Sequence, residues 1–227
     1  AGSITSEVRA STSNGFSIVK YTGTQQNATV GHGLNAPPDW IIFKDINRND
    51  EPWFVYHSTM GSSAYQFLNT TAAKTTGQSD FMNSTDPTSS VFSLGNAIGK
   101  QNRSGSNFLA LCWAAVEGFS SFGSYTGNGS TDGPFVFTGF RPKFVIRKRT
   151  DASGGGWYLI DTERDTYNVA DAFLDAADTD TEASGTGLDI LSNGFKLRNS
   201  AAGTNASSAT YIYMAFAEHP FKYARAR

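Results

Sequence analysis

The sequence predicts an all-β protein, built as a tandem duplication of two similar β-sandwich (jelly-roll-like) units of about 100 residues each. Composition is the first observation. The 227 residues include 25 Ser, 23 Thr, 15 Asn and 23 Gly, which favour turns. The chain also holds 17 Phe, 9 Tyr and 4 Trp, which are enriched in strands and rare in disordered segments. Short strands between frequent turns are typical of a sandwich or barrel.

The second observation is an internal repeat. Aromatic positions, turn residues and their spacing recur at an offset of 103 to 106 residues. Representative pairs are Gly15 with Gly118, Tyr21 with Tyr125, Pro38 with Pro142, Trp53 with Trp157, Phe67 with Phe173, Phe92 with Phe195 and Phe108 with Tyr211. We therefore expect a leader at 1–14, one sandwich over 15–117, a second over 118–221 and a basic tail at 222–227.

Each unit contains about six short runs rich in aromatic and β-branched residues, separated by clusters of turn residues. The runs predict strands at 16–21, 40–46, 53–57, 64–69, 90–94 and 107–114 in the first unit, and at 144–150, 157–161, 172–174, 194–198 and 210–217 in the second. Residues 168–178 are rich in Ala, so a helix is the alternative there. The corresponding run of the first unit favours a strand.

Charge and cysteine content exclude several classes of function. The formal net charge is −2 and the isoelectric point about 5.9, so we expect no general attraction to nucleic acid or anionic membranes. Cys112 is the sole cysteine, which excludes an intrachain disulfide and a cysteine-based zinc cluster. No apolar run is long enough for a membrane span. The chain begins at Ala1 without Met, which predicts a processed chain or a fragment.

Two tryptophans are candidates for stacking on a sugar, because an indole can cover the apolar face of a pyranose. Trp53 and Trp157 take corresponding positions in the two units. Corresponding aromatic residues of a duplicated fold are usually core residues, so we assign both to the cores. The histidines have no ligand spacing and predict neither a metal site nor a catalytic site.

The best candidate for binding is the loop at residues 124–133. Its glycines permit tight turns, and its polar side chains offer the donors and acceptors that recognise hydroxyl groups. The candidate ligand-binding residues are Tyr125, Asn128, Ser130, Thr131 and Asp132. A long hairpin turn between two strands, with no ligand, is the alternative.

One acidic segment resembles the start of a calcium-binding loop. Asp178, Asp180 and Glu182 alternate as the first ligands of such a loop do. The glycine expected at the sixth position is Ala183, and no Glu follows at the twelfth. We expect a solvated acidic loop here, with no metal and no cofactor bound by the chain.

The segment 141–149 carries five cations in nine residues. It could contact phosphate or an acidic polysaccharide. The corresponding segment of the first unit has few cations, so we expect a strand that faces solvent or a partner subunit. Motifs for nucleophilic catalysis are absent in usable form, because no Gly-x-Ser-x-Gly occurs. We therefore predict that the protein is not an enzyme.

Several segments together resemble a domain at the carboxyl end of tailed-phage structural proteins, many of them from marine and cyanobacterial phages. The resemblance extends from about Gly15 to Arg227 and rests on GFSIVKYTG, VGHGLNAPPDWIIFK, WFVYHS, GFSSFGSYTGNGSTDGPFVFTGFRPKFVIRKR, LDILSNGFKLR and YIYMAFAEHPFK. That family brings no established catalytic or binding residues. The resemblance implies a virion component of a tail fibre or related appendage, exposed on the particle surface. It implies other virion subunits as partners and a homo-oligomer, with a trimer favoured.

Three functions follow as hypotheses. The first is a host-contact module whose loops bind a receptor on the cell surface, most simply a glycan, with affinity raised by many copies. The second is a purely structural virion protein, such as a capsid decoration, collar or fibre-assembly module. The third is a polysaccharide depolymerase, which needs two carboxylates held in a cleft.

Overall fold

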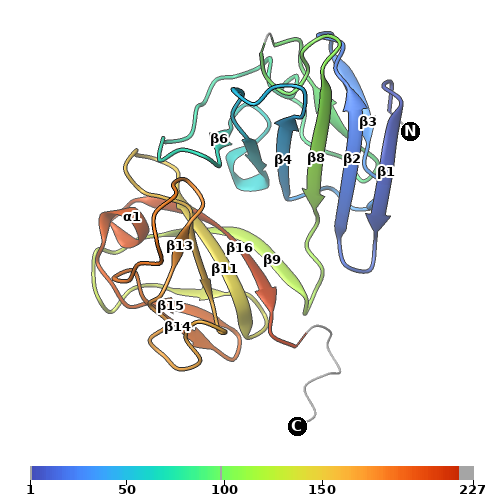
Figure 1. The fold of residues 1–227 in the computed structure, drawn as a ribbon. Helices are drawn as coiled ribbons and strands as arrows, with labels where there is room; N and C mark the ends of the chain where they lie inside the picture. The colour runs from blue at the N-terminus through green and yellow to red at the C-terminus, as the bar shows by residue number, and fades with distance from the viewer. Residues whose placement is uncertain (1, 98, 220–227) are drawn as a thin grey trace. The chain divides into compact units, whose positions relative to one another are not determined.

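The computed structural model describes residues 2–97 and 99–219, and the predicted all-β class is confirmed (Figure 1). The chain divides into two compact units. The first contains residues 1–68 and 74–115, and the second contains residues 69–73 and 116–227. Each unit consists of antiparallel sheets around a hydrophobic core of its own.

The first unit packs a small sheet against a six-stranded sheet. The order in the larger sheet is β1 (Ser6–Ser11), β2 (Phe16–Thr22), β8 (Asn107–Trp113), β4 (Trp40–Asp45), β5 (Phe54–His57) and β6 (Gln66–Phe67). The smaller sheet pairs β3 (Ala28–Gly31) with β7 (Val91–Leu94), and a 3-10 turn, η1 (Ser58–Met60), follows β5. Buried and exposed side chains alternate along β2 and β8, because neighbouring residues of a strand point to opposite faces. Val19 and Ala110, for example, are paired and enter the core together.

The second unit contains the candidate binding loop. Its five-stranded sheet has the order β13 (Leu174–Asp175), β12 (Tyr158–Asp161), β11 (Pro142–Arg149), β16 (Thr210–Ala217) and β9 (Ser120–Thr126). Its three-stranded sheet has the order β10 (Phe135–Phe137), β15 (Gly194–Leu197) and β14 (Leu188–Leu191), and a short helix, α1 (Ala202–Asn205), precedes β16. Val136 and Phe195 from the smaller sheet meet Val145 and Tyr211 from the larger one in the core.

The segment 1–14, expected to be a leader, contributes strand β1. The register places Glu7 opposite Lys20 and Val8 opposite Val19. Val8 packs against the core while Glu7 is exposed, so β1 has the alternation of a strand with one buried face. β1 therefore covers the outer edge of β2. In the described part of the second unit, by contrast, β9 is the last strand on its side of the sheet.

The other local predictions can be compared residue by residue. The stretch 168–178 forms the short strand β13, with bends around it and no helix. Trp157 is fully buried, as expected for a core residue. Trp53 is half-buried, and Lys44 Nζ lies 5.9 Å from its ring centroid. The basic tail at 222–227 lies outside the described residues. No helix in the described ranges is long and apolar enough to cross a membrane.

Cys112 is fully buried in β8, and burial raises the pKa of its thiol to about 12. Because the thiolate is the reactive form of cysteine, we expect Cys112 of the native protein not to react with a thiol-specific reagent at pH 8. One thiol per chain should react after denaturation, as a colorimetric titration would show. Rapid labelling of the native protein would contradict the burial of this side chain.

Candidate functional site in the second unit

The candidate loop connects β9 to β10, and four of its five predicted binding residues lie on the surface. Asn128, Ser130, Thr131 and Asp132 are exposed. Tyr125 is not: it is 8% exposed, stacks on Tyr211 with centroids 4.9 Å apart, and donates its hydroxyl to Thr204 O at 2.8 Å. Tyr125 therefore serves the core and offers no surface to a ligand.

A buried asparagine holds the loop in place. Asn205, at the end of α1, is fully buried, and its Oδ1 accepts from the Asn128 N–H at 2.9 Å. Its Nδ2 donates to Ser130 O at 2.8 Å and to Asn199 O at 2.7 Å. The Asn205 carbonyl also accepts from Gly129 N–H at 2.8 Å. One buried side chain thus bonds part-buried backbone groups of the loop at Asn128 and Ser130.

The loop also bonds to itself. Asn128 Oδ1 accepts from Ser130 N–H at 3.0 Å, and Asn128 Nδ2 donates to Asp132 O at 3.0 Å. Ser130 Oγ accepts from Asp132 N–H at 3.1 Å. Gly129 has φ of +69°, a left-handed conformation that glycine adopts at little cost. At Gly133 a Cβ atom would lie 2.6 Å from Leu197 Cβ, so only glycine fits there. The sequence therefore favours this one conformation of the loop.

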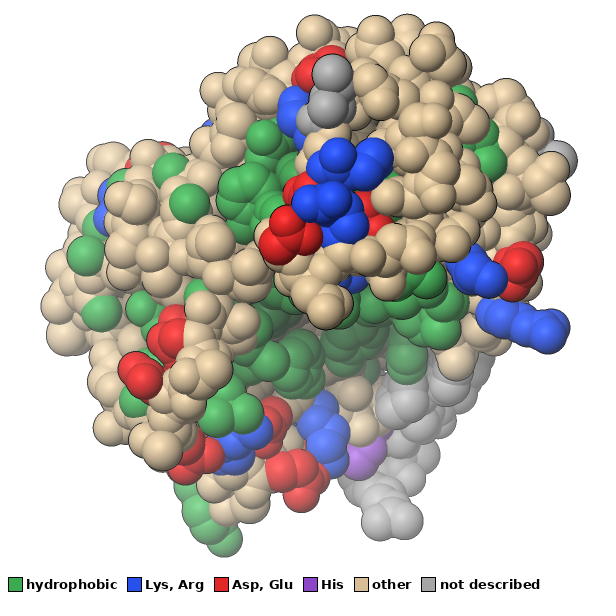
Figure 2. All heavy atoms as spheres, turned by 45° about the horizontal axis from the view of Figure 1, so that its top comes forward, with side chains coloured by type: hydrophobic (Ala, Val, Ile, Leu, Met, Phe, Trp, Pro, Cys, Tyr) green, Lys and Arg blue, Asp and Glu red, His purple; other side chains and the backbone are tan. Residues whose placement is uncertain are grey.

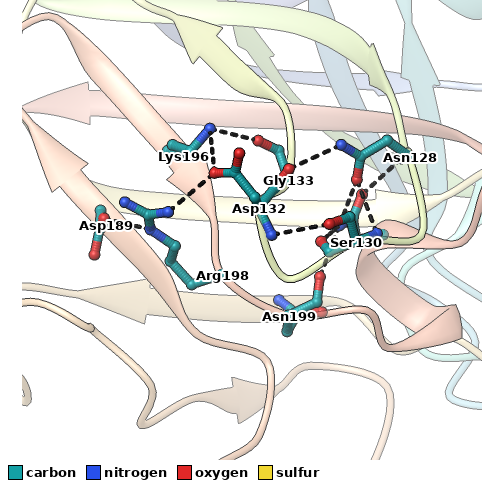
Figure 3. A network of polar contacts seen from close by, with 9 residues as sticks. Asn128, Ser130, Asp132, Gly133, Asp189, Lys196, Arg198 and Asn199 are labelled. Atoms are coloured by element: carbon teal, nitrogen blue, oxygen red, sulfur yellow. Dashed lines mark hydrogen bonds and ion pairs between the residues drawn. The ribbon is translucent and has the colours of Figure 1, made fainter.

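Asp132 is the centre of a charged network on the outer side of the smaller sheet (Figure 3). Its carboxylate lies 3.0 Å from Lys196 Nζ and 3.2 Å from Arg198 Nη1. Arg198 Nε in turn lies 2.6 Å from an oxygen of Asp189. A hydrogen bond from Lys196, with the charges of Lys196 and Arg198, lowers the pKa of Asp132. The Asp132 side chain is 79% exposed, so this fixed carboxylate remains available to a ligand.

Sequence reasoning missed the aromatic residue beside this network. Phe135 is 44% exposed and lies directly opposite Lys196 in the register of β10 and β15. Lys196 is in turn opposite Asp189 in β14, so the three side chains share one face of the sheet. The alternation of Phe135 with the buried Val136 could have indicated an outward ring. We call Phe135, Asp132, Lys196, Arg198 and Asp189 the Asp132 surface.

The three calcium candidates do not form a site. Asp178, Asp180 and Glu182 are all exposed. The Asp178 carboxylate accepts from Asp180 N–H at 3.0 Å, and Glu182 lies 3.0 Å from Arg164 Nε. No group of three or more metal-ligating side chains occurs in the ranges that the structure describes.

Segment 141–149 does not face solvent along its whole length as expected: two of its five cations are buried, and this chain supplies hydrogen-bond or ion-pair partners to all five. Arg147 and Lys148 are buried and donate to backbone carbonyls of Thr186 and Gly155. The other three form ion pairs: Arg141 with Glu218, Lys143 with Glu163 and Arg149 with Asp151. On the face that Figure 2 shows, Lys and Arg side chains likewise lie next to Asp and Glu on a largely uncharged surface.

Comparison with known proteins assigns the chain to a family without indicating an activity. No curated protein and no solved structure is similar enough to match it. Residues 1–220 match the family described as "Domain of unknown function (DUF7483)". Because the match extends over nearly the whole sequence, the chain belongs to this family.

Proposed function

We propose that the protein is a carbohydrate-binding module with no catalytic activity, which contacts a host-cell glycan through the Asp132 surface. The observation that carries the proposal is the half-exposed ring of Phe135 beside a fixed, exposed carboxylate and two cations. Sugars present an apolar face of C–H groups and a rim of hydroxyl groups. An aromatic ring next to hydrogen-bonding groups is complementary to both.

The chemistry of recognition divides between these residues. The Phe135 ring would stack on the apolar face of a pyranose. Asp132 would accept from sugar hydroxyl groups, while Lys196 and Arg198 would donate to sugar oxygens. Because the ion pairs already fix these side chains, binding costs little further side-chain entropy. The surface contains charges of both signs, which suits a glycan with little net charge.

The proposal includes a tandem duplication, in which the two units are copies of one jelly-roll-like sandwich. Strands β2, β8, β4, β5 and β6 of the first unit lie in the same order as β9, β16, β11, β12 and β13 of the second. Asn102 also resembles Asn205, since its Oδ1 accepts from Thr24 N–H and its Nδ2 donates to Gln26 O. At the offset of 104 residues, Gly31 takes the place of Phe135. Only the second copy would then have diverged for binding.

A virion setting would explain why such a modest surface suffices. The resemblance to carboxyl-terminal domains of tailed-phage proteins supports a tail-fibre or host-contact appendage on the outside of the particle, assembled with other virion subunits and favouring a trimer. Many copies on one particle would convert weak single contacts into firm adsorption.

The decisive experiment is a glycan array probed with the purified chain, followed by an assay for reducing ends on every hit. We expect binding without release. For a glycan that binds, Asp132→Asn and Phe135→Ala should each weaken affinity about tenfold or more, because each removes a central contact.

Two exposed residues provide matched controls for these variants. Glu163→Gln removes a carboxylate that is 74% exposed and paired with Lys143, as Asp132 is paired with Lys196. Tyr167→Ala removes a ring that is 86% exposed. Both should bind as the wild type does. Equal losses in all four variants would contradict the proposed surface, and release of reducing ends would identify a depolymerase.

The second candidate is a purely structural virion protein. The observation in its favour is that the loop groups bond mainly to one another and to Asn205, which a structural turn also requires. Absence of binding on the array, together with normal incorporation of the chain into particles, would favour this function.

A further inference from the structure

Strand β9 has an outer edge that no described residue pairs with, apart from the turn in which Ser120 N–H bonds to Val116 O. Its other edge pairs with β16 along its whole length. Figure 1 shows β9 at the border of the sheet of the second unit. Unpaired N–H and C=O groups along an edge are a template for another strand.

The hydrogen bonds identify which residues point outward. Gly127 N–H donates to Ala209 O, and Ala217 N–H donates to Phe119 O. Odd-numbered residues of β9 therefore bond to β16, and even-numbered residues point their backbone groups away from it. Ser124 and Thr126 are two such residues. Both are exposed, and neither their backbone groups on this side nor their side chains have a hydrogen-bond partner in the described chain.

In the first unit, the edge of β2 that corresponds to this edge of β9 is covered by another strand. There β1 covers β2 with six paired residues, and the outer face of β1 carries charge at Glu7 and Arg9. Natural proteins protect open edges with charged residues, prolines or covering segments. Strand β9, with the sequence Ser-Ser-Phe-Gly-Ser-Tyr-Thr, contains no charged residue and no proline. Among the residues that the structure describes, this edge therefore lacks the usual protection against pairing.

We propose that this edge pairs antiparallel with the same edge of a second copy of the chain. A two-fold axis through Tyr125 places Ser124 opposite Thr126 of the second copy, and Thr126 opposite its Ser124. Both residues point outward, so each of these pairs can exchange two backbone hydrogen bonds. The pairing is self-complementary, as a two-fold interface requires.

The side chains favour the second copy over other occupants. Opposed Ser and Thr side chains can bond to each other across the strands, and no like charges meet. A glycan cannot satisfy a regular row of backbone donors and acceptors as a strand does. The contact is short, because β9 has seven residues, and a standard interface buries about 1,600 Å². We therefore expect a reversible dimer that depends on concentration.

This inference does not depend on glycan binding. The Asp132 surface lies on the smaller sheet, and the proposed contact lies on the edge of the larger one. A dimer with no glycan binding, or glycan binding by a monomer, would separate the two proposals. The contact is two-fold, so it also differs from the trimer that the resemblance implies.

Cysteine cross-linking tests the register. Paired residues of this kind have Cα atoms about 5.5 Å apart, within the range that a disulfide spans. Ser124→Cys mixed with Thr126→Cys should give a covalent dimer on mild oxidation. Cys112 is buried and does not interfere. Ser130→Cys, exposed in the loop, mixed with Thr126→Cys is the control and should form no covalent dimer. Equal cross-linking in both mixtures, or none in the first, would overturn the proposal.

Sedimentation equilibrium provides an independent measurement. The wild type should pass from monomer to dimer as concentration rises, and Ser124→Pro should weaken association at least tenfold, because it removes one outward N–H at an edge where proline is tolerated. Circular dichroism checks that the variant remains folded. A wild type that stays monomeric at all concentrations, or that forms trimers, would overturn the proposal.

Discussion

Asn205→Ala is expected to lower the free energy of unfolding of the second unit by about 3 kcal/mol or more. The side chain is fully buried and bonds the Asn128 N–H and the carbonyls of Ser130 and Asn199. Alanine leaves these backbone groups without partners, and each such group costs about 1–3 kcal/mol. Chemical denaturation measures the loss, and hydrogen exchange should show faster exchange at Asn128 to Asp132.

The same substitution at two other asparagines provides the controls. Asn193 is exposed, so Asn193→Ala should change stability by about 0.5 kcal/mol or less. Asn102 is buried in the first unit and bonds Thr24 N–H, Gln26 O and Gly95 O. Asn102→Ala should therefore cost as much as Asn205→Ala, with faster exchange confined to the first unit. A loss below about 1 kcal/mol for Asn205→Ala would show that the loop does not need this anchor.

Because of Lys148, the free energy of unfolding is expected to increase as the pH rises above 8. The side chain is fully buried and donates to the carbonyls of Thr71 and Gly155. Burial lowers its pKa from 10.5 to about 8. Between these two values the unfolded chain binds more protons at this residue than the folded protein does, so stability rises with pH. Each pKa unit corresponds to about 1.4 kcal/mol, and the full effect approaches about 3 kcal/mol.

The measurement compares the pH dependence of unfolding in wild type and Lys148→Met. The difference in free energy of unfolding, wild type minus variant, should increase from pH 8 to pH 10.5. Lys143→Met is the control, since the Lys143 side chain is 45% exposed and its hydrogen bond to Glu163 raises its pKa. A flat difference between pH 8 and pH 10.5 would mean that the folded protein and the unfolded chain bind equal numbers of protons at Lys148, so that burial does not lower its pKa.

The fold class could be predicted because it depends on local properties. Turn residues and aromatic runs are visible along the chain, and they placed most strands. Strand β1 was missed because Val8 is its one strongly apolar residue, so its alternation is weak in sequence. Its place in the sheet depends on pairing with β2, which is a tertiary property.

The candidate site could be predicted in part. The loop was visible from its glycines and polar residues. Asp132 forms ion pairs with Lys196 and Arg198, which lie more than 60 residues further along the chain. Only the register of β10, β15 and β14 brings these residues together. The basic strand was misjudged for the same reason. Alternation sends Arg147 and Lys148 to opposite faces, but the carbonyls that receive them come from distant loops.

Residues 69–73 belong to the second unit although the residues on both sides of them belong to the first, which affects the order in which the chain can fold. These five residues belong to the second unit, where Thr71 O accepts from Lys148 Nζ and from Gly154 N–H. The ribosome makes them before any of residues 116–219. A fragment that begins at Val116 lacks this acceptor. The second unit reaches its final contacts only when a segment synthesised with the first is present.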